Sequence, residues 1–149
     1  MSSVFMKPSA SILSMMAVLF FVTSSALGDA SDVFMTNGIA KHHTGDLEGA
    51  LTDFDKAIEL APSDGFIYMM RGAIKKEKGD LDGALRDLNK AIELDPKLGE
   101  PYYSRGVIKR TKGDLDGSNA DFKKAVELNP KMLKFIETNG CSLSVTNSK

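Results

Sequence analysis

The chain has 149 residues, of which 42% are hydrophobic and 26% are charged, and its formal net charge is -1. This composition is that of an ordinary folded protein, which excludes a chain that is disordered throughout. The small net charge argues against a protein whose overall field attracts nucleic acid or an acidic membrane surface.

Residues 1–28 differ from the rest of the chain and are predicted to be a signal peptide. They contain one lysine and no acidic residue, and an apolar stretch runs over residues 10–22. Ala26 and Gly28 supply small residues for signal peptidase, which predicts cleavage before Asp29, with cleavage after Ala26 as the alternative. The apolar stretch is shorter than the about 20 residues of a spanning helix. We therefore expect a secreted or periplasmic protein, or a membrane-anchored one if the signal is not cleaved.

The rest of the chain is dominated by a phrase that occurs three times with a period of 34 residues. The copies are GDLEGALTDFDKAIELAP at 45–62, GDLDGALRDLNKAIELDP at 79–96 and GDLDGSNADFKKAVELNP at 113–130. The residues between the copies also recur. This divides the sequence into repeats over 31–64, 65–98 and 99–132, and a period of this length indicates stacked supersecondary units.

Each repeat is predicted to form two helices joined by a tight turn. Apolar residues in the second helix of the first repeat lie three and four positions apart, which is the spacing of one helical face. They are Leu47, Ala50, Leu51, Phe54, Ala57 and Ile58. An aspartate at the start of each second helix is a predicted N-cap, and the glycine before it ends the first helix. A proline ends each second helix. No strand is predicted, because the apolar residues do not alternate with a period of two.

This helix–turn–helix unit resembles the tetratricopeptide repeat, or TPR. The matching positions are an aromatic residue, a glycine, a small residue, a bulky residue, an alanine and a proline. They hold Phe34, Tyr68 and Tyr102; Gly38, Gly72 and Gly106; Ala50, Ala84 and Ser118; Phe54, Leu88 and Phe122; Ala57, Ala91 and Ala125; and Pro62, Pro96 and Pro130. The resemblance implies an all-α fold, a right-handed α-solenoid of three helix–turn–helix TPR-like repeats.

The C-terminal segment is predicted to add a capping helix over 133–143 and a frayed tail over 144–149. The string KMLKFIETNGCSLSV aligns with KLGEPYYSRGVIKRT and places Gly140 under Gly106. A terminal half repeat is expected to be atypical because one of its faces has no neighbour. Cys141 is the only cysteine in the sequence, so it is either free or cross-linked to another chain.

Two departures from the family pattern lead to structural expectations. Arg71 and Arg105 stand where the family has leucine in the first helix. Arg71 and Asp87 lie at equal distances on either side of a turn, and Arg105 and Asp121 share this symmetry. We therefore expect a partly buried ion pair in each of these repeats. The second departure is a glycine inside each second helix, such as Gly83, which implies either a soft helix or a close approach between helices.

No catalytic, metal or cofactor constellation is recognisable in the sequence. His42 and His43 are the only histidines, and adjacent residues on a helix point about 100° apart, which does not suit joint metal binding. The GDLDG aspartates lack the alternating ligands and closing glutamate of a calcium loop. No phosphate-binding glycine motif occurs. We therefore predict a chain that is not an enzyme and holds no metal or cofactor.

Basic residues gather near the ends of two first helices. They are Lys75, Lys76, Lys78, Lys109, Arg110 and Lys112. They could receive an acidic partner, but cations at these positions more often stabilise the negative end of a helix. Aromatic residues do not interleave with them, which argues against a nucleic-acid partner.

The resemblance implies that the first helices line a concave groove. The predicted partner-binding residues in this groove are Met35, Ile39, Met69, Met70, Ala73, Tyr103 and Val107. Some family members clamp a peptide's terminal carboxylate with polar residues, at positions that hold Met35, Ile39, Met70, Glu100 and Ser104 here, so we expect no such clamp. A methionine-rich groove suits an apolar helix or extended segment, because methionine adapts to irregular partners. In the competing interpretation these side chains pack between helices or are covered by the terminal helix.

The sequence therefore predicts a non-catalytic scaffold that holds a protein or peptide partner in its groove. One alternative is a homo-oligomer, such as a dimer, that buries the same groove and is cross-linked through Cys141. Another alternative is a non-catalytic accessory subunit of an enzyme complex. We expect no contact with a membrane apart from an uncleaved N-terminal anchor.

Overall fold

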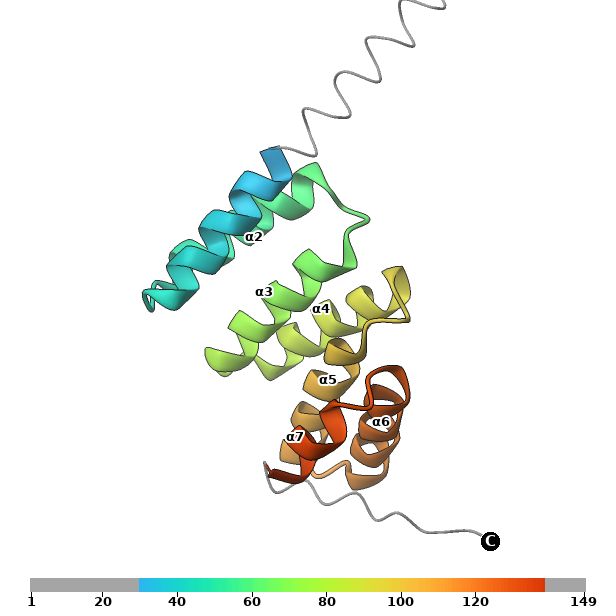
Figure 1. Cartoon of the computed structure of the whole chain (residues 1–149). Helices are drawn as coiled ribbons and strands as arrows, with labels where there is room; N and C mark the ends of the chain where they lie inside the picture. The colour runs from blue at the N-terminus through green and yellow to red at the C-terminus, as the bar shows by residue number, and fades with distance from the viewer. Residues whose placement is uncertain (1–29, 139–149) are drawn as a thin grey trace, which may run out of the picture.

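The computed structural model describes residues 30–138, and every regular element within them is a helix. A helix over residues 30–43 is followed by α2 (Leu47–Leu60), α3 (Gly65–Glu77), α4 (Leu81–Leu94), α5 (Gly99–Thr111), α6 (Leu115–Leu128) and α7 (Met132–Thr138). Successive antiparallel pairs stack along the chain (Figure 1), and α3 packs against α2, α4 and α5. This confirms the predicted all-α solenoid. The predicted signal peptide, Cys141 and the rest of the tail lie outside the described residues.

The repeated Gly-Asp dipeptide forms the turn inside each helix pair. Gly79 has a φ of 85°, in the left-handed region that favours glycine, and its two equivalents are similar. The carboxylate of Asp80 then accepts the backbone N–H of Gly83 at 2.9 Å, and the same bond forms in the other two repeats. These bonds satisfy one orphan donor at the start of each second helix and confirm the predicted caps.

The glycines inside the second helices leave room for these capping carboxylates. A Cβ atom added at Gly49, Gly83 or Gly117 would overlap Oδ2 of the aspartate three residues earlier. The close approach at each glycine is therefore to the cap of its own helix and not to the backbone of a neighbouring helix. The cap offsets part of the about 1 kcal/mol that glycine costs inside a helix.

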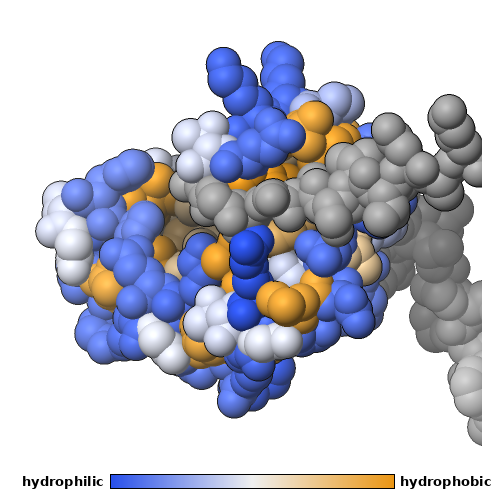
Figure 2. Space-filling view, turned by 90° about the horizontal axis from the view of Figure 1, so that it is seen from below, coloured by the Kyte–Doolittle hydropathy of each residue, from blue (hydrophilic) through white to orange (hydrophobic). Residues whose placement is uncertain are grey.

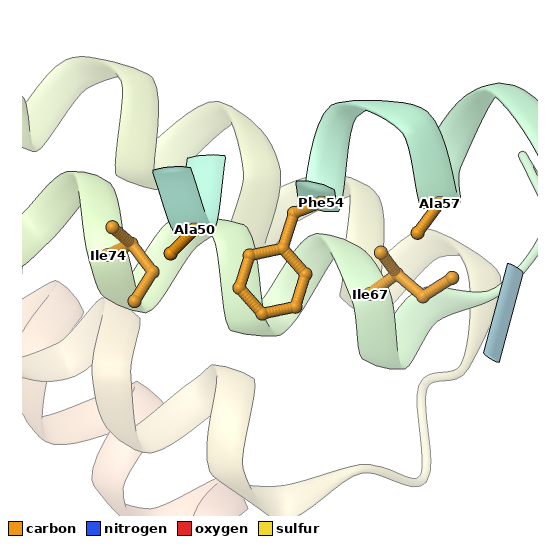
Figure 3. Close-up of a cluster of buried hydrophobic side chains, with 5 residues drawn as sticks. All are labelled: Ala50, Phe54, Ala57, Ile67 and Ile74. Atoms are coloured by element: carbon orange, nitrogen blue, oxygen red, sulfur yellow. The ribbon is translucent and has the colours of Figure 1, made fainter. Parts of the chain in front are cut away.

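The hydrophobic core is divided into three clusters, each of which spans two repeats. In the first cluster, Ala50, Phe54 and Ala57 of α2 face Ile67 and Ile74 of α3 (Figure 3). The other two clusters join α4 to α5 and α6 to α7, and they contain Ala84, Leu88 and Ile108, and Phe122, Ala125, Met132 and Ile136. The second helix of each repeat thus completes its core with the first helix that follows, so stacking is required for burial.

The predicted arginine–aspartate pairs are present inside the second and third repeats. Arg71 donates to both carboxylate oxygens of Asp87, with Nε–Oδ2 and Nη2–Oδ1 distances of 2.8 and 2.6 Å. Arg105 binds Asp121 in the same way, at 2.9 and 2.6 Å. Both aspartates are 4% exposed. The hydrogen bonds to Asp87 raise the pKa of Arg71 above its usual value, although burial opposes this effect.

Each arginine also reaches back to the preceding repeat. Nη1 of Arg71 lies 2.6 Å from Oδ1 of Asp55 in α2, and Nη1 of Arg105 lies 2.7 Å from Oδ1 of Asn89 in α4. One guanidinium group therefore joins the second helices of two successive repeats. In the first repeat Asn37 takes the arginine's place, where the described residues offer no earlier second helix to bridge.

The terminal helix α7 does not keep the burial register of the repeats. Ile67 of α3 is 1% exposed, whereas Phe135, which the sequence alignment places at the same position, is 55% exposed. Met132 and Ile136 are buried instead, and they pack with Phe122 of α6. The burial pattern is shifted because these two apolar side chains, four residues apart, share the face that α7 turns toward α6.

Replacement of Asp87 by alanine tests the buried ion pair. Asp87→Ala is expected to lower the free energy of unfolding by about 3–5 kcal/mol, because it leaves the Arg71 guanidinium partly buried without its main partner. Urea unfolding followed by circular dichroism measures this loss. The control is Asp55→Ala, whose carboxylate is 58% exposed, and its expected loss is below about 1 kcal/mol. Equal losses for the two variants would contradict the assignment.

Replacement of Gly106 by alanine tests the close packing within a repeat. Its Cβ would lie 2.8 Å from Cε1 of Phe122 and 3.2 Å from the Ser118 carbonyl oxygen. Gly106→Ala is therefore expected to lower stability by about 1–3 kcal/mol, as overpacking does. At Gly72 the nearest atoms are 3.3 Å away, so Gly72→Ala should cost less. Thermal unfolding gives the order, and a smaller loss at Gly106 than at Gly72 would refute it.

Candidate functional site

The central first helix, α3, carries an apolar face that borders the core and stays partly accessible. Phe66, Met69, Met70 and Ala73 lie three and four residues apart and so share one face, which we call the α3 stripe. Phe66 was not among the predicted binding residues, although it is 40% exposed. Its spacing from the two methionines was the signal that could have identified it.

All seven predicted partner-binding residues are half-buried. Met35, Ile39 and Met70 pack against the α2–α3 cluster, Met69 against the α4–α5 cluster, and Tyr103 and Val107 against the α6–α7 cluster. Each of these six side chains therefore contributes to packing between helices and keeps part of its surface accessible. Their role in partner binding stays a prediction. On the face seen in Figure 2, hydrophobic residues occur as separate patches among hydrophilic ones.

Tyr103 is shared between the predicted binding face and the terminal helix. Its ring centroid lies 5.8 Å from that of Phe122 and 5.3 Å from that of Phe135 in α7, the latter in an edge-on arrangement. Such aromatic pairs contribute beyond the burial of their area. The helix α7 thus uses part of the first-helix face of the third repeat. The α3 stripe is the main apolar part that remains of the predicted binding face.

Two carboxylates stand at the positions equivalent to Phe66 in the neighbouring first helices. Asp32 lies near the start of the helix over 30–43, and Glu100 lies near the start of α5. Both are exposed, and neither forms an ion pair with a described residue. The two acids therefore occupy, in the first helices before and after α3, the position that Phe66 occupies in α3.

The basic residues at the other end of the first helices are mostly paired inside the chain. Lys75 binds Asp87 at 2.8 Å, Lys109 binds Asp121 at 2.9 Å, Lys112 binds Asp82 at 2.6 Å, and Lys78 pairs with Glu48. The latter two pairs join successive repeats. Four of the six cations noted in the sequence are therefore neutralised by the fold, which favours a structural role over the recruitment of an acidic partner.

No three histidine, cysteine, aspartate or glutamate side chains between residues 30 and 138 come together in a way that could hold a metal ion. His42 instead contacts Glu77, with 2.7 Å between Nε2 and Oε2. A cavity of about 190 Å³ is lined by Arg110, Leu115, Ser118 and Asn119. A larger one, of about 320 Å³, is lined by Asp32, Val33, Thr36 and Asn37. None of the described helices has the length and apolar character needed to cross a bilayer.

Comparisons with known proteins agree with the geometry. A family model described as "TPR repeat" matches residues 72–111, and one described as "Tetratricopeptide repeat" matches residues 38–64 and 99–132. Together these matches cover more than half of the chain. A search of curated protein sequences found no significant match.

Three solved structures illustrate the similarity of fold. The Arabidopsis OM64 TPR domain is 26% identical with a TM-score of 0.71, over 76% of this chain and 95% of that one. The N-terminal domain of stress-induced protein-1 from C. elegans is 25% identical with a TM-score of 0.65, over 76% and 96%. The first TPR of Spaghetti (RPAP3), bound to the HSP90 peptide SRMEEVD, is 19% identical with a TM-score of 0.68, over 77% and 98%. The chain therefore belongs to the tetratricopeptide repeat family, and its three helix pairs are TPR units.

Proposed function

We propose that this TPR protein is a non-catalytic adaptor that binds a protein or peptide segment on the face formed by its first helices. The observation that carries the proposal is the α3 stripe. Its four side chains are apolar, three of them are half-buried and Phe66 is 40% exposed. Covering such a surface stabilises a complex by about 25 cal/mol per Å² of apolar area removed from water. Methionine side chains suit this task because they adapt to the shape of a partner.

A structural relative supports this use of the fold. The RPAP3 domain described above carries a bound peptide, which shows that a TPR domain of similar shape holds a short segment. Our chain differs at the positions where acidic peptides are clamped in some family members. Met70 and Ser104 lack a charge, and Glu100 is an exposed carboxylate of the wrong sign for a peptide's terminal carboxylate. The proposed partner is therefore held by apolar contacts, without a carboxylate clamp.

We also propose that the adaptor works outside the cytoplasm, in the secreted or periplasmic space. The support is the composition of residues 1–28, which lie outside the described residues. Ser31, two residues after Asp29, is 2% exposed and donates its hydroxyl to the Ala57 carbonyl oxygen at 3.2 Å. Cleavage before Asp29 would leave this contact in place.

Replacement of Phe66 by aspartate tests the binding face. Phe66→Asp is expected to reduce the recovery of protein partners at least about tenfold, because a charge would enter the surface that a partner covers. Affinity capture with the purified chain as bait, followed by quantitative mass spectrometry, measures the recovery. Leu115→Asp is the matched control, since Leu115 is 59% exposed on α6, away from the stripe. Recovery of the same partners by all three baits would contradict the proposal.

The N-terminus of the exported chain tests the predicted export. Expression with a secretion system is expected to yield a chain that begins at Asp29, which Edman sequencing or intact mass identifies. Replacement of Gly28 by a bulky residue such as tyrosine should block or shift the cleavage, because the peptidase requires a small residue there. A chain that stays in the cytoplasm with residues 1–28 intact would refute this part of the proposal.

A further inference from the structure

The charges around the α3 stripe are not balanced. At one end of the first helices, Asp32 and Glu100 are exposed and form no ion pair with a described residue. At the other end, most cations are already paired with carboxylates of the chain, as with Lys75 and Asp87. At the Phe66 end, this surface therefore carries two carboxylates that form no ion pair with a described residue. Lys76, three residues after Ala73, brings a positive charge to the other end of the same face.

We propose that the bound segment is a peptide with an apolar centre and lysine or arginine residues on both sides of it. This inference rests on the proposed function of the α3 stripe. The apolar centre covers Phe66, Met69 and Met70, and the flanking cations meet Asp32 and Glu100. A segment with acidic flanks is disfavoured, because it would bring like charges together at both ends.

Helix geometry sets the spacing of the cations in the partner. Packed helices lie about 8–10 Å apart, and an extended chain advances about 3.3 Å per residue. A segment that crosses from the 30–43 helix over α3 to α5 therefore spans about three residues between neighbouring first helices. The expected motif has a basic residue two to three positions before the apolar anchor and another two to three positions after it.

The hydroxyl groups of Thr36 and Ser104 extend the same two flanks. Thr36 lies four residues after Asp32, and Ser104 lies four residues after Glu100, so each shares a helical face with its acid. The Thr36 hydroxyl donates to the Asp32 carbonyl oxygen at 2.8 Å, which leaves its oxygen as an acceptor. Both flanks thus offer further oxygen acceptors to the N–H groups of lysine or arginine.

Selection from a displayed library of randomised nine-residue peptides tests the inference with the purified full chain as target. The wild type is expected to enrich peptides with an apolar centre and basic residues on both sides. The double variant Asp32→Lys/Glu100→Lys should lose this preference and enrich acidic flanks. The control Glu59→Lys/Asp116→Lys changes the net charge equally at exposed positions on α2 and α6, and it should retain the basic preference.

The outcomes separate the inference from the proposed function. Apolar peptides enriched by the wild type without basic flanks would overturn the charge rule but leave the adaptor function standing. No enrichment by the wild type would overturn both. For an enriched peptide, fluorescence anisotropy should show the affinity of the double variant reduced about two- to fivefold for each lost pair, as expected for exposed ion pairs. The reduction should shrink in high salt, and a salt-independent reduction would count against the ion pairs.

Discussion

The structure depends on one bulky side chain in each second helix that packs in two directions. A Cβ at Gly38 would lie 3.2 Å from the Phe54 ring, so this ring rests directly on the first helix of its own repeat. On its other side the same ring meets Ile67 and Ile74 of the next repeat. Leu88 repeats the arrangement between α3 and α5. Since each cluster needs residues from two repeats, a single helix pair cannot bury its core, and the chain is stable only as a stack.

Ionic contacts fix the register of the helices that this apolar packing brings together. The Arg71 guanidinium group binds two carboxylate oxygens of Asp87 and one of Asp55. Because these hydrogen bonds are planar and directional, they restrict the rotation of one repeat against the other. A buried pair of this kind is weak evidence for stability by itself, since the loss of solvation opposes the attraction. Its contribution here is to fix the register between helices, while the clusters supply the free energy.

The same arrangement determines which faces of α3 are used for packing between helices. Two faces of α3 are used for packing: Ile67 and Ile74 face α2 of the preceding repeat, and Gly72 faces α4 of its own repeat. The face that remains carries Phe66 and the methionines, and the acids at the starts of the neighbouring helices border it. Stacking places these faces side by side, so recognition is spread over several helices. In the proposed binding mode, charge at the borders selects a partner that the apolar centre alone would not distinguish.

The sequence by itself determined the helices, their caps and the Arg71–Asp87 pair, because each follows from spacing within one repeat. The 34-residue period and the resemblance to the TPR gave the stacked architecture. The sequence also located the apolar positions of the first helices, although Phe66 was not among the predicted binding residues. Only the tertiary structure decided the bond from Arg71 to Asp55, the internal pairing of most basic residues and the shifted burial of α7. Arg71 and Asp55 lie 16 positions apart, and the Lys78–Glu48 and Lys112–Asp82 pairs join residues 30 positions apart in successive repeats. The Lys75–Asp87 and Lys109–Asp121 pairs lie within one repeat. All of these side chains meet only once the helices have packed, which local periodicity does not specify.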